Sequence, residues 1–410
     1  MLTNITRQIR KAALLFAVLP AMLSGCTFLV PPQTEAPEEE LKEILFFIPS
    51  PIVGTSSASQ FVYVTAAEDW KVEIEYNGDQ KDWVTLSALS GSKCDNFNLV
   101  LQWTANTAAE ERSVLFTLTS GSESTSSILS QSGKTSGGGG TMEIKESVPS
   151  AGWLELPATD NTDLYFISHD MTVGNYTGRN YSYYYDVENL LARWVAYPLN
   201  KSLASSGSRT NAWGLDPKVP IPLQPVLFSG FKRGTDGNLY DRGHQQPSAD
   251  RLEANSNKAT FYGTNMTPQL GALNQRCWAS LESAVRDWSY QFDTLYVVTG
   301  ADVRGATHTS QDNYGKNVTI PTGYYKALLG YKKNGQFAGM NQTGGYTAIG
   351  FYFEHKSYTD SRETIKAQSM SIDELEKKLG IDFFVNLPGK IGQDYADKVE
   401  SKVDTWWFNK

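Results

Sequence analysis

A glycine-rich run, GKTSGGGG at residues 133–140, divides this chain of 410 residues into two unequal parts. Glycine loses more conformational freedom on folding than any other residue, so such a run stays a flexible coil instead of joining a core. The run therefore predicts a linker, which we place over residues 134–148. Separate domains are expected on either side of it, over residues 44–133 and 149–410.

The first 26 residues have the pattern of a secretory signal. Three basic residues precede a short apolar run that ends in Leu-Ser-Gly-Cys at residues 23–26. The apolar run is too short and wrongly flanked to span a membrane. The small residues before Cys26 resemble a bacterial lipobox, which implies a signal peptide over residues 1–25 and acylation of Cys26. A chance cysteine behind an ordinary signal is the alternative.

Residues 26–43 are rich in proline and glutamate and predict a solvated tether behind the lipid. Several acyl chains would anchor the chain firmly, because each buried methylene contributes about 0.8 kcal/mol. The lipobox resemblance thus implies a lipoprotein of the Gram-negative cell envelope. The outer membrane is the expected location, with the chain facing either the periplasm or the outside.

Acidic residues are concentrated in the front half of the chain. The formal net charge is −8, and residues 26–140 hold 15 acidic and 6 basic side chains, a net charge of −9. The signal contributes +3, which leaves −2 for residues 141–410. A nearly neutral domain can still have a local basic cleft, so this charge does not exclude a nucleic-acid partner.

Alternation of apolar and polar residues over 44–133 predicts an all-β, immunoglobulin-like sandwich. The alternating runs are FVYVTA, WKVEIEY, NLVLQWTA and SVLFTLTS. Their order, with WVTLSALSG and a closing SILSQSG, resembles the BACON family, whose domains are proposed to bind glycan or mucin. Trp70, Trp83 and Trp103 are the candidate sugar-stacking residues, although tryptophans that alternate in strands are more often core. We therefore favour a spacer over a glycan-binding domain.

Strand and helix patterns mix over residues 149–410, which predicts an α+β domain with a central antiparallel sheet and flanking helices. A capping box, in which Ser371 stands three residues before Glu374, marks the start of one helix. The expected strands are 194–199, 293–300, 324–331 and 346–353, and the expected helices are 273–292 and 371–381.

One stretch of this domain gathers side chains suited to phosphate chemistry. DRGH at 241–244 contains one of only four histidines, and the chain shows neither a His/Cys zinc cluster nor a phosphate-binding glycine loop. Hydrolysis of a phosphodiester needs a base for water, a cation at the phosphate and positive charge near the transition state. The candidate residues are His244, Asn265, Asn274, Glu282, Arg209, Arg242 and Arg286.

The helix expected over 273–292 relates two of these candidates. Asn274 stands at its start and Glu282 eight residues later, roughly 12 Å along a straight helix. Both residues therefore cannot bind one ion directly, but Glu282 can hold a water of the ion's hydration shell. A hard cation such as Mg²⁺, which keeps several waters, suits this arrangement, with Mn²⁺ or another divalent ion as alternatives.

Three motifs, in this order and spacing, resemble the DNA/RNA non-specific endonuclease family, the ββα-metal nucleases that include endonuclease G. They are DRGHQQPSAD, TFYGTNMTPQ and LNQRCWASLE, and the similarity extends over nearly all of residues 150–390. The resemblance implies a ββα-metal fold that cleaves DNA and RNA to 5′-phosphate products. It makes His244 the general base and Asn274 the direct protein ligand of the metal. Glu282 would orient metal-bound water, Arg242 and Arg209 would stabilise charge, and Asn265 and Arg286 would shape the site.

Structural interpretations compete with several of these roles. Asn265 lies in a turn-like stretch where an asparagine can simply satisfy backbone groups. Glu282 and Arg286 are spaced i, i+4 and can form an ordinary helix salt bridge. Arg276 either contacts phosphate or lies on the surface, and Cys94 and Cys277 are expected to be buried and unpaired. For the whole chain, the alternative function is an adhesin with a weak or inactive nuclease fold that binds glycan or mucin.

Overall fold

The structure is a computed structural model that describes residues 44–48, 51–77, 79–133, 144–204, 206–335 and 340–408. The expected signal, the tether and residues 134–143 of the expected linker lie outside the described residues. No helix in the described ranges is long and apolar enough to cross a membrane.

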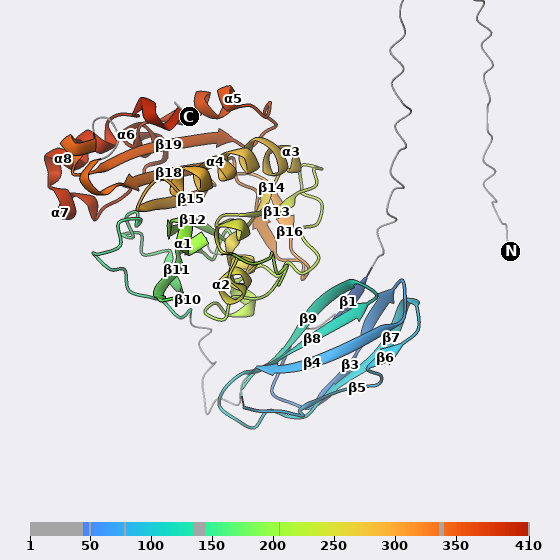
Figure 1. The fold of residues 1–410 in the computed structure, drawn as a ribbon. Helices are drawn as coiled ribbons and strands as arrows, with labels where there is room; N and C mark the ends of the chain where they lie inside the picture. Colours follow the sequence, from blue (N-terminus) through green and yellow to red (C-terminus); the bar gives the residue numbers. More distant parts are fainter. Residues whose placement is uncertain are drawn as a thin grey trace, which may run out of the picture. The chain divides into compact units, whose positions relative to one another are not determined.

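Residues 45–131 form strands in two sheets (Figure 1). Strand pairs are antiparallel except β2 with β9, and the strand orders are β1-β3-β7-β5 and β2-β9-β8-β4-β6. Trp70, Trp83 and Trp103 are only 4%, 3% and 8% exposed and belong to the core between these strands, which agrees with the core interpretation favoured from sequence over sugar stacking. The strands are β1 (Leu45–Phe47), β2 (Ile52–Val53), β3 (Ala58–Ala66), β4 (Trp70–Asn77), β5 (Val84–Leu86), β6 (Ser90–Gly91), β7 (Cys94–Trp103), β8 (Arg112–Ser120) and β9 (Glu123–Gln131).

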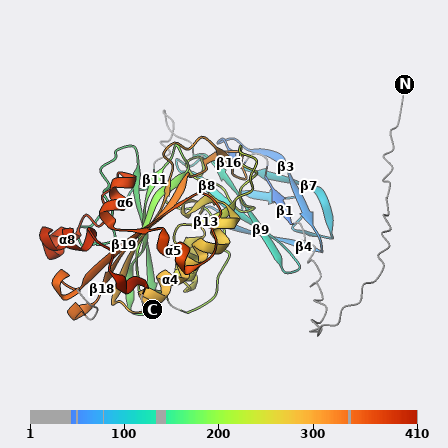
Figure 2. The same ribbon diagram turned by 90° about the horizontal axis from the view of Figure 1, so that it is seen from above.

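A seven-stranded antiparallel sheet organises the second part of the chain, with the order β10-β11-β12-β15-β18-β19-β20. Alternate residues of its strands enter two separate cores: Val195 packs with residues of α4, and Trp194 with residues of α6 and α8. Figure 2 shows these helices on either side of the sheet. The strands are β10 (Tyr165–Val173), β11 (Tyr176–Asp186), β12 (Leu191–Leu199), β15 (Thr294–Asp302), β18 (Gly323–Tyr331), β19 (Tyr346–Glu354) and β20 (Ser369–Met370).

Two short hairpins and several helices complete this part. The antiparallel pairs, both called hairpins below, are β13 (Asp241–His244) with β14 (Met266–Gln269), whose strands are joined by residues 245–265 including α2, and β16 (Thr309–Gln311) with β17 (Asn317–Thr319). The helix α6 begins with the predicted capping box and ends at Gly380, whose φ of 70° suits glycine at a helix C-terminus. The helices are α1 (Lys201–Ala204), α2 (Ala254–Thr260), α3 (Gly271–Leu273), α4 (Ala279–Ser289), α5 (Arg362–Ala367), α6 (Ile372–Leu379), α7 (Leu387–Ile391) and α8 (Gln393–Glu400).

The mixed architecture, the central antiparallel sheet and the four predicted strands are confirmed. The prediction of one continuous helix over 273–292 is wrong. A π-helical turn, Asn274–Trp278, separates α3 from α4, and Arg276 inside it has non-helical dihedral angles. A π turn inserts one residue into the helical repeat, so the straight-helix spacing between Asn274 and Glu282 does not apply.

Candidate active site

A hairpin and the helix that follows it carry most of the motif residues. In the β13–β14 pairing, Asp241 lies opposite Gln269 and His244 opposite Met266. The two strands run beside α3 and α4 (Figure 1). Gly243 is needed here, because a Cβ atom at this position would lie 2.5 Å from Oε1 of Gln269. The glycine of DRGH therefore lets the hairpin close next to a buried glutamine side chain.

A cavity of about 360 Å³ opens beside this hairpin. It brings together three of the residues predicted from sequence, namely Arg209, Arg242 and Asn274. The described residues that line this cavity do not include the other four predicted residues, His244, Asn265, Glu282 and Arg286. The remaining lining residues are Trp213, Ser229, Gly230, Phe231, Tyr240 and Asp241.

Asp241 fixes the amide of Asn274. Its Oδ2 accepts hydrogen bonds from Nδ2 of Asn274 at 2.9 Å and from Nε2 of Gln275 at 2.8 Å. The π turn allows two consecutive side chains to reach the same oxygen. With Nδ2 engaged in this way, the carbonyl oxygen of Asn274 is the atom left to bind a cation or a water.

Arg242 is held flat against an aromatic ring. Its Cζ lies 3.4 Å from the centroid of Trp213, and its NH1 donates to the carbonyl oxygens of Leu227 and Phe228, both at 2.8 Å. Burial, and then the nearby Arg209, lower the pKa of Arg242 to about 10, so the guanidinium remains charged at neutral pH. Three contacts thus orient one cation at the wall of the cavity.

Arg209 contributes the second cation of the cavity. Its Nε donates to Oδ1 of Asn211 at 2.7 Å, and its NH1 donates to Oγ of Ser248 at 3.1 Å. Its Cζ lies 4.7 Å from the centroid of Phe261. The two arginines raise the local positive potential in a domain that is otherwise almost neutral.

His244 is a neutral imidazole between two aromatic rings. Its ring centroid lies 5.1 Å from that of Phe261 and 5.7 Å from that of Trp213. Burial lowers the pKa of His244, and the positive charges of Arg209 and Arg242 lower it further, while a hydrogen bond with the backbone of Arg242 partly opposes them. The resulting pKa is about 3. Nε2 is buried and has no hydrogen-bond partner among the described residues. The imidazole is therefore in the form that accepts a proton, but water must gain access to its Nε2.

Glu282 and Arg286, both half-buried, belong to an ionic cluster outside the cavity lining that also contains the buried Asp250 and Lys326. Arg286 forms its ion pair with Asp250, at 3.0 Å between NH1 and Oδ1, instead of the i, i+4 pair considered from sequence. Burial raises the pKa of Glu282, although Lys326 opposes this shift. Lys326 itself is fully buried, and its Nζ donates to Oγ1 of Thr299 at 2.7 Å. The cluster joins α4 to the strand β18.

Asn265 braces the chain that follows His244. It is fully buried, its Oδ1 accepts from the backbone N–H of Gln246 at 2.9 Å, and its Nδ2 donates to the carbonyl oxygens of Gln246 and Thr260. All of these contacts are to backbone groups, which is the turn interpretation raised from the sequence. The side chain of Asn265 can act on chemistry only by holding the hairpin.

The sequence did not assign a role to three residues that contribute to the site. Trp213 stands in SRTNAWGLDP, where only Arg209 was singled out, and an aromatic residue near two arginines is the signal that was available. Asp241 opens the DRGH motif without a role assigned from sequence, and in the structure it holds Asn274. Nothing in the local pattern around Lys326 distinguishes it from the other residues of a buried strand.

The hairpin, the interrupted helix and the paired arginines define a site for a phosphate ester, on a sheet of mixed α/β architecture. The family described as DNA/RNA non-specific endonuclease matches residues 165–390, more than half of the chain. The chain therefore belongs to that family, and it is a nuclease.

Known nucleases are similar to this chain over the same region. A nuclease of Nostoc sp. is 31% identical over 241 residues, which cover 57% of this chain and 81% of the relative. A nuclease of Serratia marcescens is 27% identical over 215 residues, 50% and 73% of the two chains. The human mitochondrial endonuclease G is 26% identical over 174 residues, 40% and 55%.

Proposed function

We propose that this nuclease is a Mg²⁺-dependent endonuclease that hydrolyses phosphodiester bonds of both DNA and RNA and leaves 5′-phosphates. The observation that carries the proposal is one cavity that contains Asn274, held by Asp241, together with Arg209 and Arg242, and whose Trp213 packs against the neutral His244 outside the lining. Nucleic acids are the expected substrates, as the family membership implies.

The donors at the cavity fit a hard divalent cation. Asn274 offers an amide oxygen and Asp241 a carboxylate, which are the ligand types that Mg²⁺ takes while it keeps several waters. In the described ranges, no group of three or more His, Cys, Asp or Glu side chains is placed to hold a metal. A zinc-type cage is therefore not formed there, and a cation held by Asn274 and waters agrees with the donor set. When bound, the cation would supply charge at the phosphate and at the departing 3′ oxygen.

The side chains of this chain divide the remaining tasks. His244 accepts a proton from the attacking water, because its imidazole is neutral at physiological pH. Arg242 and Arg209 stabilise the charge that develops on the phosphate. Glu282 orients water at the metal, and Asn265 and Arg286 keep the surrounding elements in place. Because the helix is interrupted between them, this proposal connects Glu282 and Asn274 through the waters of the cation and not through their spacing along one helix.

We further propose the domain organisation that the sequence predicts. It comprises a signal peptide over 1–25, a tether over 26–43, a BACON-like sandwich over 44–133, a linker over 134–148 and the nuclease domain over 149–410. Lipidation of Cys26 would hold the nuclease on the cell envelope, at the outer membrane. The adhesin alternative is not supported by Trp70, Trp83 and Trp103, because these candidates for sugar stacking are core residues.

The proposal is tested by incubating the mature protein with plasmid DNA and with RNA across a series of divalent metals. Cleavage of both substrates with Mg²⁺, its loss in EDTA and products that a 5′-phosphate-dependent exonuclease degrades are expected. Cleavage that continues in EDTA, or products with 5′-hydroxyl ends, would contradict it.

A further inference from the structure

One segment, residues 209–216, connects the cavity to the interior of the domain; we call it the site arm. Its first part brings Arg209 and Trp213 to the cavity. In its middle, Gly214 forms a parallel bridge with Tyr262, close to the second strand of the hairpin. Its last residue, Asp216, is buried and lies outside the cavity lining. Thr210 is held by Asn257 and Gly214 by the backbone of Phe261, and the far end of the arm is held by the partners of Asp216.

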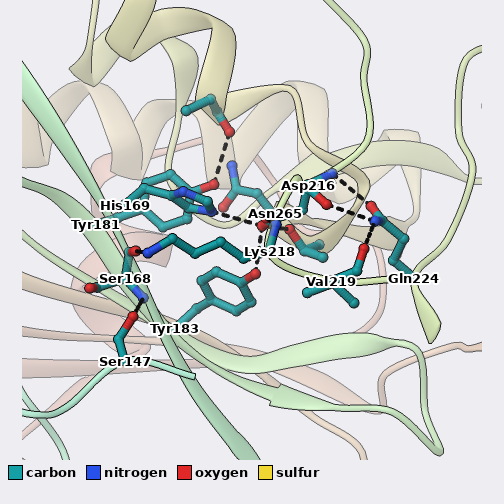
Figure 3. Close-up of polar contacts among 12 residues, drawn as sticks. Ser147, Ser168, His169, Tyr181, Tyr183, Asp216, Lys218, Val219, Gln224 and Asn265 are labelled. Atoms are coloured by element: carbon teal, nitrogen blue, oxygen red, sulfur yellow. Dashed lines mark hydrogen bonds and ion pairs between the residues drawn. The ribbon is translucent and has the colours of Figure 1, made fainter. Parts of the chain in front are cut away.

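The carboxylate of Asp216 gathers donors from three other segments (Figure 3). Its Oδ2 accepts from Nε2 of His169 at 2.8 Å, from the hydroxyl of Tyr183 at 2.5 Å and from Oγ1 of Thr264 at 2.9 Å. Its Oδ1 accepts from the backbone N–H of Lys218 at 2.8 Å. One carboxylate thus ties the site arm to β10, to β11 and to the residue before Asn265.

His169 is the ionisable partner in this group. Burial alone would raise the pKa of Asp216. The charge of His169, its hydrogen bond and the hydrogen bond from Tyr183 instead hold the pKa below its ordinary value. A buried carboxylate is stable only when it is paired and fully hydrogen-bonded. Among the described residues, the contact of Asp216 with a basic side chain is the one between its Oδ2 and Nε2 of His169, 2.8 Å apart, which becomes an ion pair when the imidazole is protonated.

The strand that carries His169 is shaped to present it. The register of β10 against β11 shifts between His169 and Asp170, which is a β-bulge. Bulges redirect side chains, and they are frequent next to active sites. The ring of His169 packs against those of Tyr181, Tyr183 and Tyr262, at centroid distances between 5.1 and 5.9 Å. The imidazole therefore has one orientation, with Nε2 directed at Asp216.

We propose that His169, acting through Asp216, is a positioning residue of the nuclease: it fixes the site arm, and with it Arg209 and the Trp213 ring that supports Arg242. This inference rests on the proposed function, because its effect is on phosphodiester cleavage. His169 does not contact the substrate. Its contribution is the placement of both arginines relative to His244.

The experiment compares two replacements of His169 in the full mature protein. His169→Phe keeps an aromatic ring and removes the donor, whereas His169→Gln keeps an N–H donor for Asp216. Displacement of catalytic groups by about 1 Å can cost on the order of 100-fold in rate, so kcat of His169→Phe is expected to fall ~10- to 100-fold. The KM for nucleic acid is expected to change by less than about threefold, and His169→Gln is expected to recover most of kcat, since only the positioning is affected.

Glu155→Gln is the matched control, because Glu155 is also a fully buried carboxylate in an ion pair, at 2.5 Å from Arg179, but lies outside the site arm. It is expected to lower the melting temperature and to leave kcat within about twofold of wild type. An unchanged kcat in folded His169→Phe, or an equal loss in Glu155→Gln, overturns the inference. If His169→Phe does not fold, Asp216→Asn, which weakens the acceptor of the His169 bond, replaces it: a lower kcat in the folded variant supports the inference, and an unchanged kcat overturns it.

The wild type and His244→Ala are measured in the same series. Mg²⁺-dependent cleavage by the wild type that is lost in His244→Ala shows that the proposed function holds, whatever the His169 variants do. Absence of cleavage by the wild type would overturn both proposals, whereas failure of the His169 series alone overturns only this one.

Discussion

The guanidinium carbon of Arg242 lies 3.4 Å from the centroid of the Trp213 ring, and the same ring lies 5.7 Å from that of His244. One aromatic side chain therefore supports a cation of the cavity and covers the imidazole proposed as the base. Phe261 packs against the same imidazole from 5.1 Å, and Nε2 of His244 is buried in these surroundings.

Replacement of Trp213 by alanine should impair catalysis more than folding. A cation–π contact contributes about 0.5–2 kcal/mol, so loss of orientation at Arg242 predicts a roughly 3- to 30-fold lower kcat/KM. Trp213→Phe should retain part of the activity, because it keeps a ring face. Trp153→Ala is the control, since Trp153 supports Arg179 at 4.7 Å away from the site. Steady-state kinetics on a defined oligonucleotide would show the difference, and equal losses in both alanine variants would contradict it.

Removal of the Asp241 carboxylate should weaken metal binding. Partners that orient a metal ligand typically contribute 10- to 100-fold in affinity, so Asp241→Ala is expected to raise the Mg²⁺ concentration for half-maximal activity by about this factor. Gln275→Ala, which removes the other donor to the same oxygen, should change it less, because Asn274 keeps its partner. A Mg²⁺ titration of the cleavage rate measures both variants. An unchanged midpoint in Asp241→Ala would show that Asn274 does not depend on Asp241.

The pH dependence of kcat/KM should reflect the low pKa of His244. Its value of about 3 lies below that of an ordinary histidine, so the neutral base persists as the pH falls through 6.5. Arg209→Ala removes a positive charge that disfavours protonated His244. The pKa that governs the acidic limb of the pH–rate profile should therefore rise. The pH–rate profile of kcat/KM, which reports groups of the free enzyme, is the measurement. A limb that stays in place or moves to lower pH in Arg209→Ala would contradict the assignment.

Lys326 and Glu282 should depend on each other for stability. Burial lowers the pKa of Lys326 and raises that of Glu282, and each opposes the shift of the other. No direct ion pair joins the two among the described residues, so removal of one charge is expected to cost less than the about 3–5 kcal/mol typical of a contacting buried pair. Lys326→Met should therefore unfold at a lower denaturant concentration than wild type, and adding Glu282→Gln should restore part of the loss. Additive effects in the double variant would show that the two residues are independent.

Much of the fold was predictable because it depends on local patterns. The strands β15 and β18 are mostly apolar and largely buried on both faces, and α6 carries its capping box within four residues. The motif DRGH also forms one short strand, so its candidates were found together.

The remainder of the site depends on contacts between distant segments. Asp216 and His169 are 47 residues apart, and nothing in either local stretch relates them. The π turn at Asn274 coincides with its contact to Asp241, which is 33 residues away, and helix propensity over 273–292 predicts an unbroken helix instead. Such features become visible only when the packing is known.

The most direct test of the account is the rate of Mg²⁺-dependent cleavage of plasmid DNA by folded His244→Ala relative to wild type. A positioned general base typically contributes 10²- to 10⁴-fold, so the variant is expected to be at least ~100-fold slower on DNA, with a comparable loss on RNA. Full cleavage by His244→Ala at the wild-type rate would contradict the proposal that this site performs the reaction.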